Sequence, residues 1–313
     1  MSRDPYPDLA RKYDLQIQRA LMDSWDALRG MVSENDLARI LATEGVSGIY
    51  RLLDQFNITI SQRLMPVMQA AMIESGRVAI AIIPSSAVTT PAYITAMPRS
   101  ASVDAVIAER IDQISVESAS AVRQAVDTAM SAGRPPLEIA RDFRESIGLT
   151  TQQESFVANY RTNLENLDRN ALLRALRDKR SDSSIERAIA ENAPLSKERI
   201  DKLVSQYRSR WIKYRSQVIA RTESLTAVSV AQDEAIGKAI ADGHISPNII
   251  KRWVTTEDGR ERPVHEELHG DEVRFGEYFS NSLGRLRYPR DPDGSAENVI
   301  QCRCRVQYVL PKS

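Results

Sequence analysis

The sequence predicts a mainly α-helical protein, in which an elongated helical N-terminal region is followed by a small α+β C-terminal subdomain packed on a long helix. The 313 residues include only 13 glycines and 14 prolines, and good helix formers recur without the alternation that is typical of strands. After residue 243, short segments of β-branched and aromatic residues lie between glycines, prolines and charges, which indicates short strands. These patterns predict three regions: 1–133, 134–243 and 244–313.

The N-terminal region, residues 1–133, is predicted to form helices interrupted by a connector at residues 84–102 that is rich in proline, serine and threonine. After the connector, Val103, Ile107 and Ile111 recur at helical spacing, which places them on one apolar stripe. That helix is expected to end at Gly133, because a glycine followed by prolines is a typical helix terminus.

The middle region, residues 134–243, is predicted to be a helical core. Gly148 suits the end of one helix and Thr150 the start of the next, and Ser196 can cap a long helix that runs to about Arg221 or further. Several large side chains on that long helix alternate at three and four residues, which predicts a buried seam. They are Val204, Tyr207, Trp211, Tyr214 and Val218.

The C-terminal region, residues 244–313, is predicted to contain short strands near 251–256, 271–275 and 302–310, joined by irregular loops. So few residues can enclose only a small core of their own. We therefore expect this subdomain to depend on the long helix for its stability.

Charge and hydropathy limit where such a protein works. Its 42 basic and 42 acidic side chains give a formal net charge of zero, which argues against a protein that coats nucleic acid over its whole surface. The sequence has no apolar run long enough to span a bilayer, and its first residues lack the apolar core of a signal peptide. We expect a protein that is made in the cytosol and has no membrane partner.

A series of polar and aromatic residues follows in a characteristic order from the long helix to the end of the chain. The series consists of Arg221, Thr222, Glu223, Trp253, Asp258, Arg262, His265, Gly270, Pro289, Cys302, Arg303 and Cys304. In order and spacing it resembles the phage Mu F-like minor head protein family, also called the phage head morphogenesis family. The resemblance covers about residues 133–310, and it departs from the family pattern at Gln301, where asparagine is usual.

This resemblance implies a structural, non-enzymatic minor head protein of a tailed bacteriophage, present in few copies inside the head near the portal vertex. It implies roles in capsid assembly and in DNA packaging or ejection. It also implies that the protein is in the host cytoplasm during assembly. The implied partners are the portal protein, contacted by residues 1–133, and also viral genomic DNA and the scaffolding or major capsid protein.

Two histidines and both cysteines of the C-terminal region suggest a metal site. His265 and His269 would face one way on a helix, and with Cys302 and Cys304 they could complete a tetrahedral structural zinc shell. The alternative is a hydrogen bond from His265 to Asp258 or Glu223 beside two small buried cysteines, because strand alternation would point the cysteines to opposite faces.

Three further hypotheses concern the charged residues. A zinc-dependent hydrolase or nuclease would use His265 and His269 with a nearby acid. Ion pairs of Arg221 and Arg262 with Glu223 and Asp258 could tie the long helix to the C-terminal subdomain. A basic set on the long helix could bind DNA without sequence preference, or could be a solvated face paired with acids elsewhere. This basic set is Lys202, Arg208, Arg210, Lys213 and Arg215.

Overall fold

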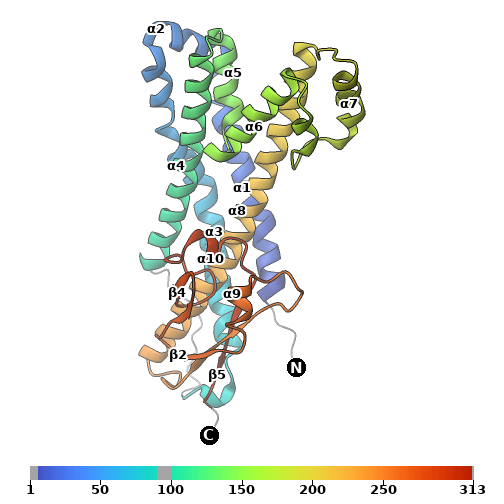
Figure 1. The fold of residues 1–313 in the computed structure, drawn as a ribbon. Helices are drawn as coiled ribbons and strands as arrows, with labels where there is room; N and C mark the ends of the chain where they lie inside the picture. Colours follow the sequence, from blue (N-terminus) through green and yellow to red (C-terminus); the bar gives the residue numbers. More distant parts are fainter. Residues whose placement is uncertain (1–5, 90–100, 312–313) are drawn as a thin grey trace. The chain divides into compact units, whose positions relative to one another are not determined.

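A computed structural model describes residues 6–89 and 101–311 and confirms the mainly α-helical fold with a small C-terminal sheet. Figure 1 shows the order of the helices along the chain. They are α1 (Tyr6–Gly30), α2 (Glu34–Leu52), α3 (Gln55–Ala81), α4 (Ala101–Ser131), α5 (Pro136–Ser146), α6 (Thr151–Glu165), α7 (Asp182–Ala190), α8 (Lys197–Ala241), α9 (Pro263–Glu266) and α10 (Ala296–Val299). Short 3₁₀ turns occur at Ser85–Ala87, Arg169–Leu173 and Lys179–Ser181.

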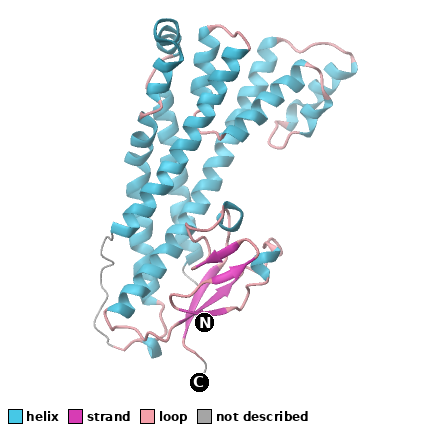
Figure 2. Ribbon diagram, turned by 60° about the vertical axis from the view of Figure 1, so that its left-hand side comes forward, coloured by secondary structure: helices cyan, strands magenta, loops and turns pink. Residues whose placement is uncertain are grey.

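The described strands all lie between Ile250 and Val309, and they are drawn in magenta in Figure 2. They are β1 (Ile250–Val254), β2 (Glu272–Arg274), β3 (Phe279–Asn281), β4 (Gly284–Leu286) and β5 (Arg305–Val309). Strand β1 is the centre of a three-stranded antiparallel sheet, with β2 on one side and β5 on the other. Strands β3 and β4 form a separate hairpin. The three predicted strand segments are β1, β2 and β5, whereas the hairpin was not predicted.

The chain forms two compact units, each assembled from separated segments. The first unit contains Met1–Arg19, Leu64–Glu109 and Val218–Ser313, and the second contains Ala20–Arg63 and Arg110–Gln217. The three sequence regions that we predicted remain a prediction about domains. Part of the connector predicted at 84–102, residues 90–100, lies outside the described residues.

The core of the first unit joins the C-terminal strands to helices from both ends of the chain. Trp253 on β1 is fully buried and packs its ring against Phe279 of β3 at a centroid distance of 5.1 Å. On α8, Gly237 leaves room for the ring of Phe275, because an added Cβ there would lie 3.2 Å from Cζ. Residues before α4 take part as well, since the amide of Ser246 donates to the carbonyl of Ala87 at 2.9 Å.

The core of the second unit surrounds Trp25 on α1, which is fully buried. Gly148, with φ of 95°, lies directly against the indole, and a Cβ at this position would be only 2.8 Å from Trp25 Cδ2. Thr150 then starts α6 with a reciprocal capping box shared with Gln153. Both local predictions at Gly148 and Thr150 are therefore confirmed.

The long helix α8 begins after Ser196, whose hydroxyl accepts from the amide of Arg199 at 3.2 Å, and it continues to Ala241. The predicted aromatic seam is only partly buried, because Tyr207 is enclosed while Tyr214 is 41% exposed. Among the described residues, no helix has the length and apolar character needed to cross a bilayer.

Candidate metal centre

The structure brings His265, Cys302 and Cys304 together in the first unit. All three are buried, with exposed fractions of 1%, 1% and 3%. His265 Nδ1 lies 3.6 Å from Cys302 Sγ and 3.7 Å from Cys304 Sγ. The three ligand-type atoms all lie within 4.8 Å of one another, which is close enough for one metal ion to contact all of them.

Local backbone geometry explains why both cysteines reach the same imidazole. Strand β5 begins only at Arg305, so the cysteines lie in irregular chain that follows a left-handed residue, Gln301, with φ of 56°. The expectation that strand alternation would send the two thiols to opposite faces is therefore wrong, because alternation applies only within a strand. Both cysteines are free thiols.

A hydrogen-bonded pair of asparagines holds the other side of the imidazole. His265 Nε2 lies 2.7 Å from Asn298 Oδ1 on α10, and Asn281 Nδ2 donates to the same oxygen at 3.1 Å. Asn281 Oδ1 in turn accepts from the amide of Leu283 at 2.9 Å. The predicted partners of His265, Asp258 and Glu223, are not the groups that bond to its ring.

Arg290 holds the cysteine segment through hydrogen bonds, and its side chain is only 1% exposed. Its Nη1 donates to the carbonyls of Cys302 at 3.0 Å and Cys304 at 2.5 Å, while Nη2 donates to Ser229 Oγ on α8 at 2.7 Å. The guanidinium thus joins the segment to the long helix. Arg290 was not among the predicted site residues, because only the fold brings this arginine to the cysteine segment.

The electrostatics of the cluster distinguish the two thiols. A hydrogen bond from Cys304 lowers the pKa of the Cys302 thiol well below its usual 9.0, against the opposing effect of burial, and His265 and Arg290 lower it further. The same bond and burial raise the pKa of Cys304. The site therefore favours a thiolate at Cys302, which is the form that binds metals.

His269 does not belong to the cluster. Helix α9 ends at Glu266, so the helical spacing that would have aligned His265 with His269 is interrupted after a single turn. The His269 side chain is 39% exposed, and its Nδ1 lies 2.7 Å from Thr255 Oγ1. The structure therefore assembles three of the four predicted zinc ligands.

The polar anchors between α8 and the C-terminal strands differ from those predicted. Thr222 Oγ1 accepts from the amide of Gln301 at 3.2 Å, and Arg262 donates to the carbonyl of Ile300 at 2.5 Å. Asp258 pairs with Arg303 and Arg260 rather than with Arg221 or Arg262. Its short bonds to these two arginines hold the pKa of the Asp258 carboxyl below its usual range.

The remaining residues of the predicted series have structural positions. Glu223 is buried on α8, and Pro289 is buried next to Arg290. Gly270 adopts φ of 85° and donates its amide to the carbonyl of Trp253 at 2.9 Å, so it forms the turn that leads into β2. Trp253 packs edge-on against His265 with a centroid distance of 5.5 Å.

A cavity of about 350 Å³ in the first unit reaches Cys304. Its wall includes side chains of α1 and α8 together with several arginines near the cysteine segment. These arginines are Arg11, Arg221, Arg290, Arg303 and Arg305. One of the two cysteines thus borders a space large enough for water molecules.

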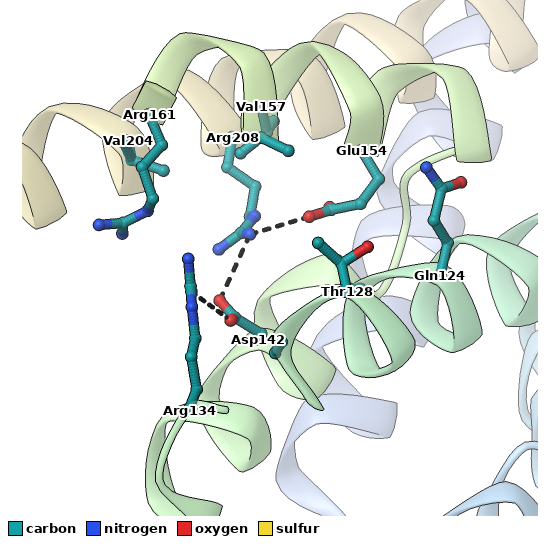
Figure 3. A pocket seen from close by; sticks show the side chains of 12 residues that line it. Gln124, Thr128, Arg134, Asp142, Glu154, Val157, Arg161, Val204 and Arg208 are labelled. Carbon is teal, nitrogen blue, oxygen red and sulfur yellow. Dashed lines mark hydrogen bonds and ion pairs between the residues drawn. The ribbon is translucent and has the colours of Figure 1, made fainter. Parts of the chain in front are cut away.

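The basic set predicted for DNA binding does not form a surface stripe on α8. Figure 3 shows Arg208 pointing toward Glu154 and Asp142, to which it pairs at 3.1 and 3.6 Å. Arg215 is buried as well, with Nη2 2.8 Å from Glu117, and its guanidinium lies over the ring of Trp25. The guanidinium groups of Arg208 and Arg215 therefore already bond to carboxylates and carbonyls of the second unit.

The other three members of the basic set differ in exposure. Arg210 donates to the carbonyl of Arg177 at 2.7 Å and pairs with Asp178 at 3.2 Å. Lys202 and Lys213 are exposed. All three arginines thus pair with acids elsewhere, as the alternative proposed, but Arg208 and Arg215 are buried and do not lie on a solvated face.

Comparison with known proteins identifies similarity over parts of the chain. Residues 169–307 match the family model described as Phage Mu protein F like protein. A segment of 103 residues is 32% identical to the NAD(+)--arginine ADP-ribosyltransferase EFV of Enterococcus faecalis (strain V583) and covers 31% of this chain. That match spans only 20% of the length of the relative. No solved structure matches the chain.

Proposed function

Because residues 169–307 match the phage Mu protein F like family, we propose that the chain is a minor head protein of a tailed bacteriophage. The family points to phage head morphogenesis in general. The more specific part of the proposal is that the protein is a structural component of the virion, located inside the head at the portal vertex. There it assists capsid assembly and DNA packaging or ejection.

The observation that supports this proposal most directly is the family match itself, together with the positions of several residues within the matched range. Thr222 on α8, His265, Cys302 and Cys304 converge on one buried polar cluster within the first unit. Groups that lie in the interior and bond to the backbone and to one another are typical of a scaffold that holds a fold together. A structural role is thus the simplest use of these residues.

The hydrolase or nuclease hypothesis receives less support. It relied on His265 and His269 as joint zinc ligands, and His269 lies outside the cluster with Thr255 as its partner. The activity in the name of the Enterococcus relative is that of a much longer protein, of which this chain spans one fifth. We therefore propose a non-enzymatic protein.

Any contact with viral DNA would not involve the buried arginines of the basic set. Arg208 and Arg215 are committed to buried acidic and carbonyl partners, so they are not available to phosphates. If the protein binds DNA, we expect Lys202, Lys213 and other exposed cations to contribute, with an affinity that falls as salt rises.

The proposal is tested in the phage or prophage that encodes the chain. Purified virions are analysed by mass spectrometry, and heads are reconstructed without imposed symmetry in the presence and absence of the gene. We expect the protein in virions at low copy number, density for it beside the portal, and defective or empty heads without it. A protein that is absent from virions, or spread evenly over the shell, would contradict the proposed location.

A further inference from the structure

We infer that His265 Nδ1, Cys302 Sγ and Cys304 Sγ bind one thiophilic metal ion of the zinc class, with an open fourth position. The inference concerns the chemistry of the C-terminal subdomain and does not depend on the role of the protein in a phage head. It rests on the separation of the three atoms, on the tautomer of the imidazole, and on the fit of the surrounding groups.

The separations match a tetrahedral metal site. With metal–sulfur and metal–nitrogen bonds of about 2.3 and 2.0–2.1 Å, a tetrahedral zinc ion places its nitrogen and sulfur ligands about 3.6 Å apart. The two nitrogen–sulfur distances here are 3.6 and 3.7 Å. Both edges of the ligand triangle that meet at His265 therefore already have the length that one shared ion requires.

The hydrogen bonds around the imidazole fix its tautomer. The amide of Leu283 can only donate, so the atom of Asn281 that it contacts is the oxygen, and the Asn281 amide nitrogen therefore faces Asn298 Oδ1. Asn298 Oδ1 is an acceptor, which means that His265 Nε2 carries the hydrogen. In the neutral imidazole, Nδ1 then presents its lone pair to the two sulfurs, and an orienting acceptor on the other nitrogen is the usual arrangement for a metal-binding histidine.

Hydrogen bonding to the imidazole can engage only one of the two sulfurs. A neutral imidazole has one acceptor nitrogen with a single lone pair, yet two thiols approach it at nearly equal distances. Only one of them can donate a full hydrogen bond to it. A cation bound to all three atoms uses the lone pair and both sulfurs together. A disulfide across one intervening residue would instead be strained.

The surroundings supply the remaining requirements of a metal site. Arg290 donates to the carbonyls of both cysteines, so the segment that presents the sulfurs is held in place from α8. Cys304 lines the cavity of about 350 Å³, which provides a route for the ion and space for a water as fourth ligand. The bound ion would connect α9 to the chain that enters β5.

The first test measures metal in the full-length protein purified under reducing conditions. Elemental analysis is expected to find one zinc ion per chain. After removal of zinc with a chelator, titration with Co²⁺ is expected to give thiolate-to-cobalt charge-transfer absorption that saturates at one ion per chain. X-ray absorption at the metal edge should resolve two sulfurs and at least one imidazole nitrogen. Full-length protein that neither contains nor takes up a stoichiometric metal, or whose metal has no sulfur ligands, would overturn the inference.

Variants assign the ligands. Cys302→Ser, Cys304→Ser and His265→Asn should each abolish stoichiometric binding, whereas His269→Asn, the matched control at the histidine outside the cluster, should keep it. Asn298→Ala should weaken Co²⁺ affinity by about 10- to 100-fold, because it removes the group that orients the imidazole. Equal loss in His269→Asn would contradict the ligand assignment. Circular dichroism checks each fold, and where a ligand variant is unfolded, the absorption spectrum of the wild-type protein decides.

Discussion

At the scale of single residues, Asp233 on α8 offers a test of the buried charges in the first unit. Its Oδ1 is buried without a hydrogen-bond partner among the described residues. Burial raises the pKa of this carboxyl from 3.8 to about 6, although Lys251 and Arg287 act in the opposite direction. The folded state therefore binds this proton more tightly than the unfolded chain does. The stability that this group contributes increases as pH falls from above 6 toward 4 and is lost as pH rises through 6.

Asp233→Asn removes this titration while nearly preserving shape. We expect the variant to be more stable than the wild-type protein at pH 7 to 8 by up to about 3 kcal/mol, the free-energy equivalent of the pKa difference. The advantage should disappear near pH 4. Urea unfolding of both proteins across this pH range measures the difference. A constant difference between the two proteins at every pH would show that Asp233 is not the titrating group.

Arg208 in the second unit shows how a charge run on a helix can be misinterpreted. Three carboxylates surround it, namely Asp142, Glu145 and Glu154, and coulombic attraction to these acids raises its pKa despite complete burial. Arg208→Met would leave these acids without a buried cation, so we expect a loss of about 3–5 kcal/mol in the free energy of unfolding. Lys213→Met, at an exposed position of the same helix, should change it by no more than about 0.5 kcal/mol. Similar small effects at both positions would instead favour an exposed basic set on α8, as the DNA-binding hypothesis assumed.

The same scale shows which parts of the site could be predicted. Residue types and their order identified His265 and both cysteines, because few side chains have that chemistry. The sequence could not identify Arg290 and Asn298, since an arginine and an asparagine are common on loops. Nor could it exclude His269, because the length of α9 decides whether two histidines four residues apart share a face.

At the scale of elements, helix termini were predictable wherever one residue has a specific backbone role. Ser196, Gly148 and Thr150 lie where capping and positive φ require them. The β3–β4 hairpin was missed because its two short strands contain no β-branched residue, which is the composition that marks a strand. The turn at Gln301, just before the cysteines, was not predicted either. Gln301 is the position at which the sequence departs from the family pattern.

That turn leads to a prediction for Gln301. The residue has φ of 56°, a left-handed conformation that asparagine adopts more readily than glutamine, and asparagine is what the family pattern has here. Gln301→Asn should therefore stabilise the protein by on the order of 0.5–1 kcal/mol. The hydrogen bond from the backbone amide of this residue to Thr222 should be kept. The matched control is Gln307→Asn, on extended backbone in β5, which should not stabilise. Thermal unfolding compares the two, and an equal shift in both would exclude a backbone origin.

At the scale of the whole molecule, the grouping of segments into units could not be predicted from local patterns. The first unit combines residues from the start, the middle and the end of the chain, and periodicity carries no information about which distant helices meet. The C-terminal region is hydrogen-bonded to α8 and to residues before α4, through Ser229, Thr222 and the backbone of Ala87. We expected this region to depend on the long helix because it is small. These hydrogen bonds are the specific contacts through which it would do so.

These contacts predict that residues 244–313 do not fold when they are produced alone. The fragment would lose the hydroxyl of Ser229 that pairs with the buried Arg290, the hydroxyl of Thr222 and the surface of Gly237 against Phe275. What remains is a three-stranded sheet and a hairpin, a core too small to offset the chain entropy. Trp253, the only tryptophan in the fragment and fully buried in the whole chain, reports on the outcome. We expect its fluorescence to match that of the urea-unfolded fragment, with zinc present or absent. Cooperative unfolding of the isolated fragment would show that α8 supports this region less than its contacts indicate.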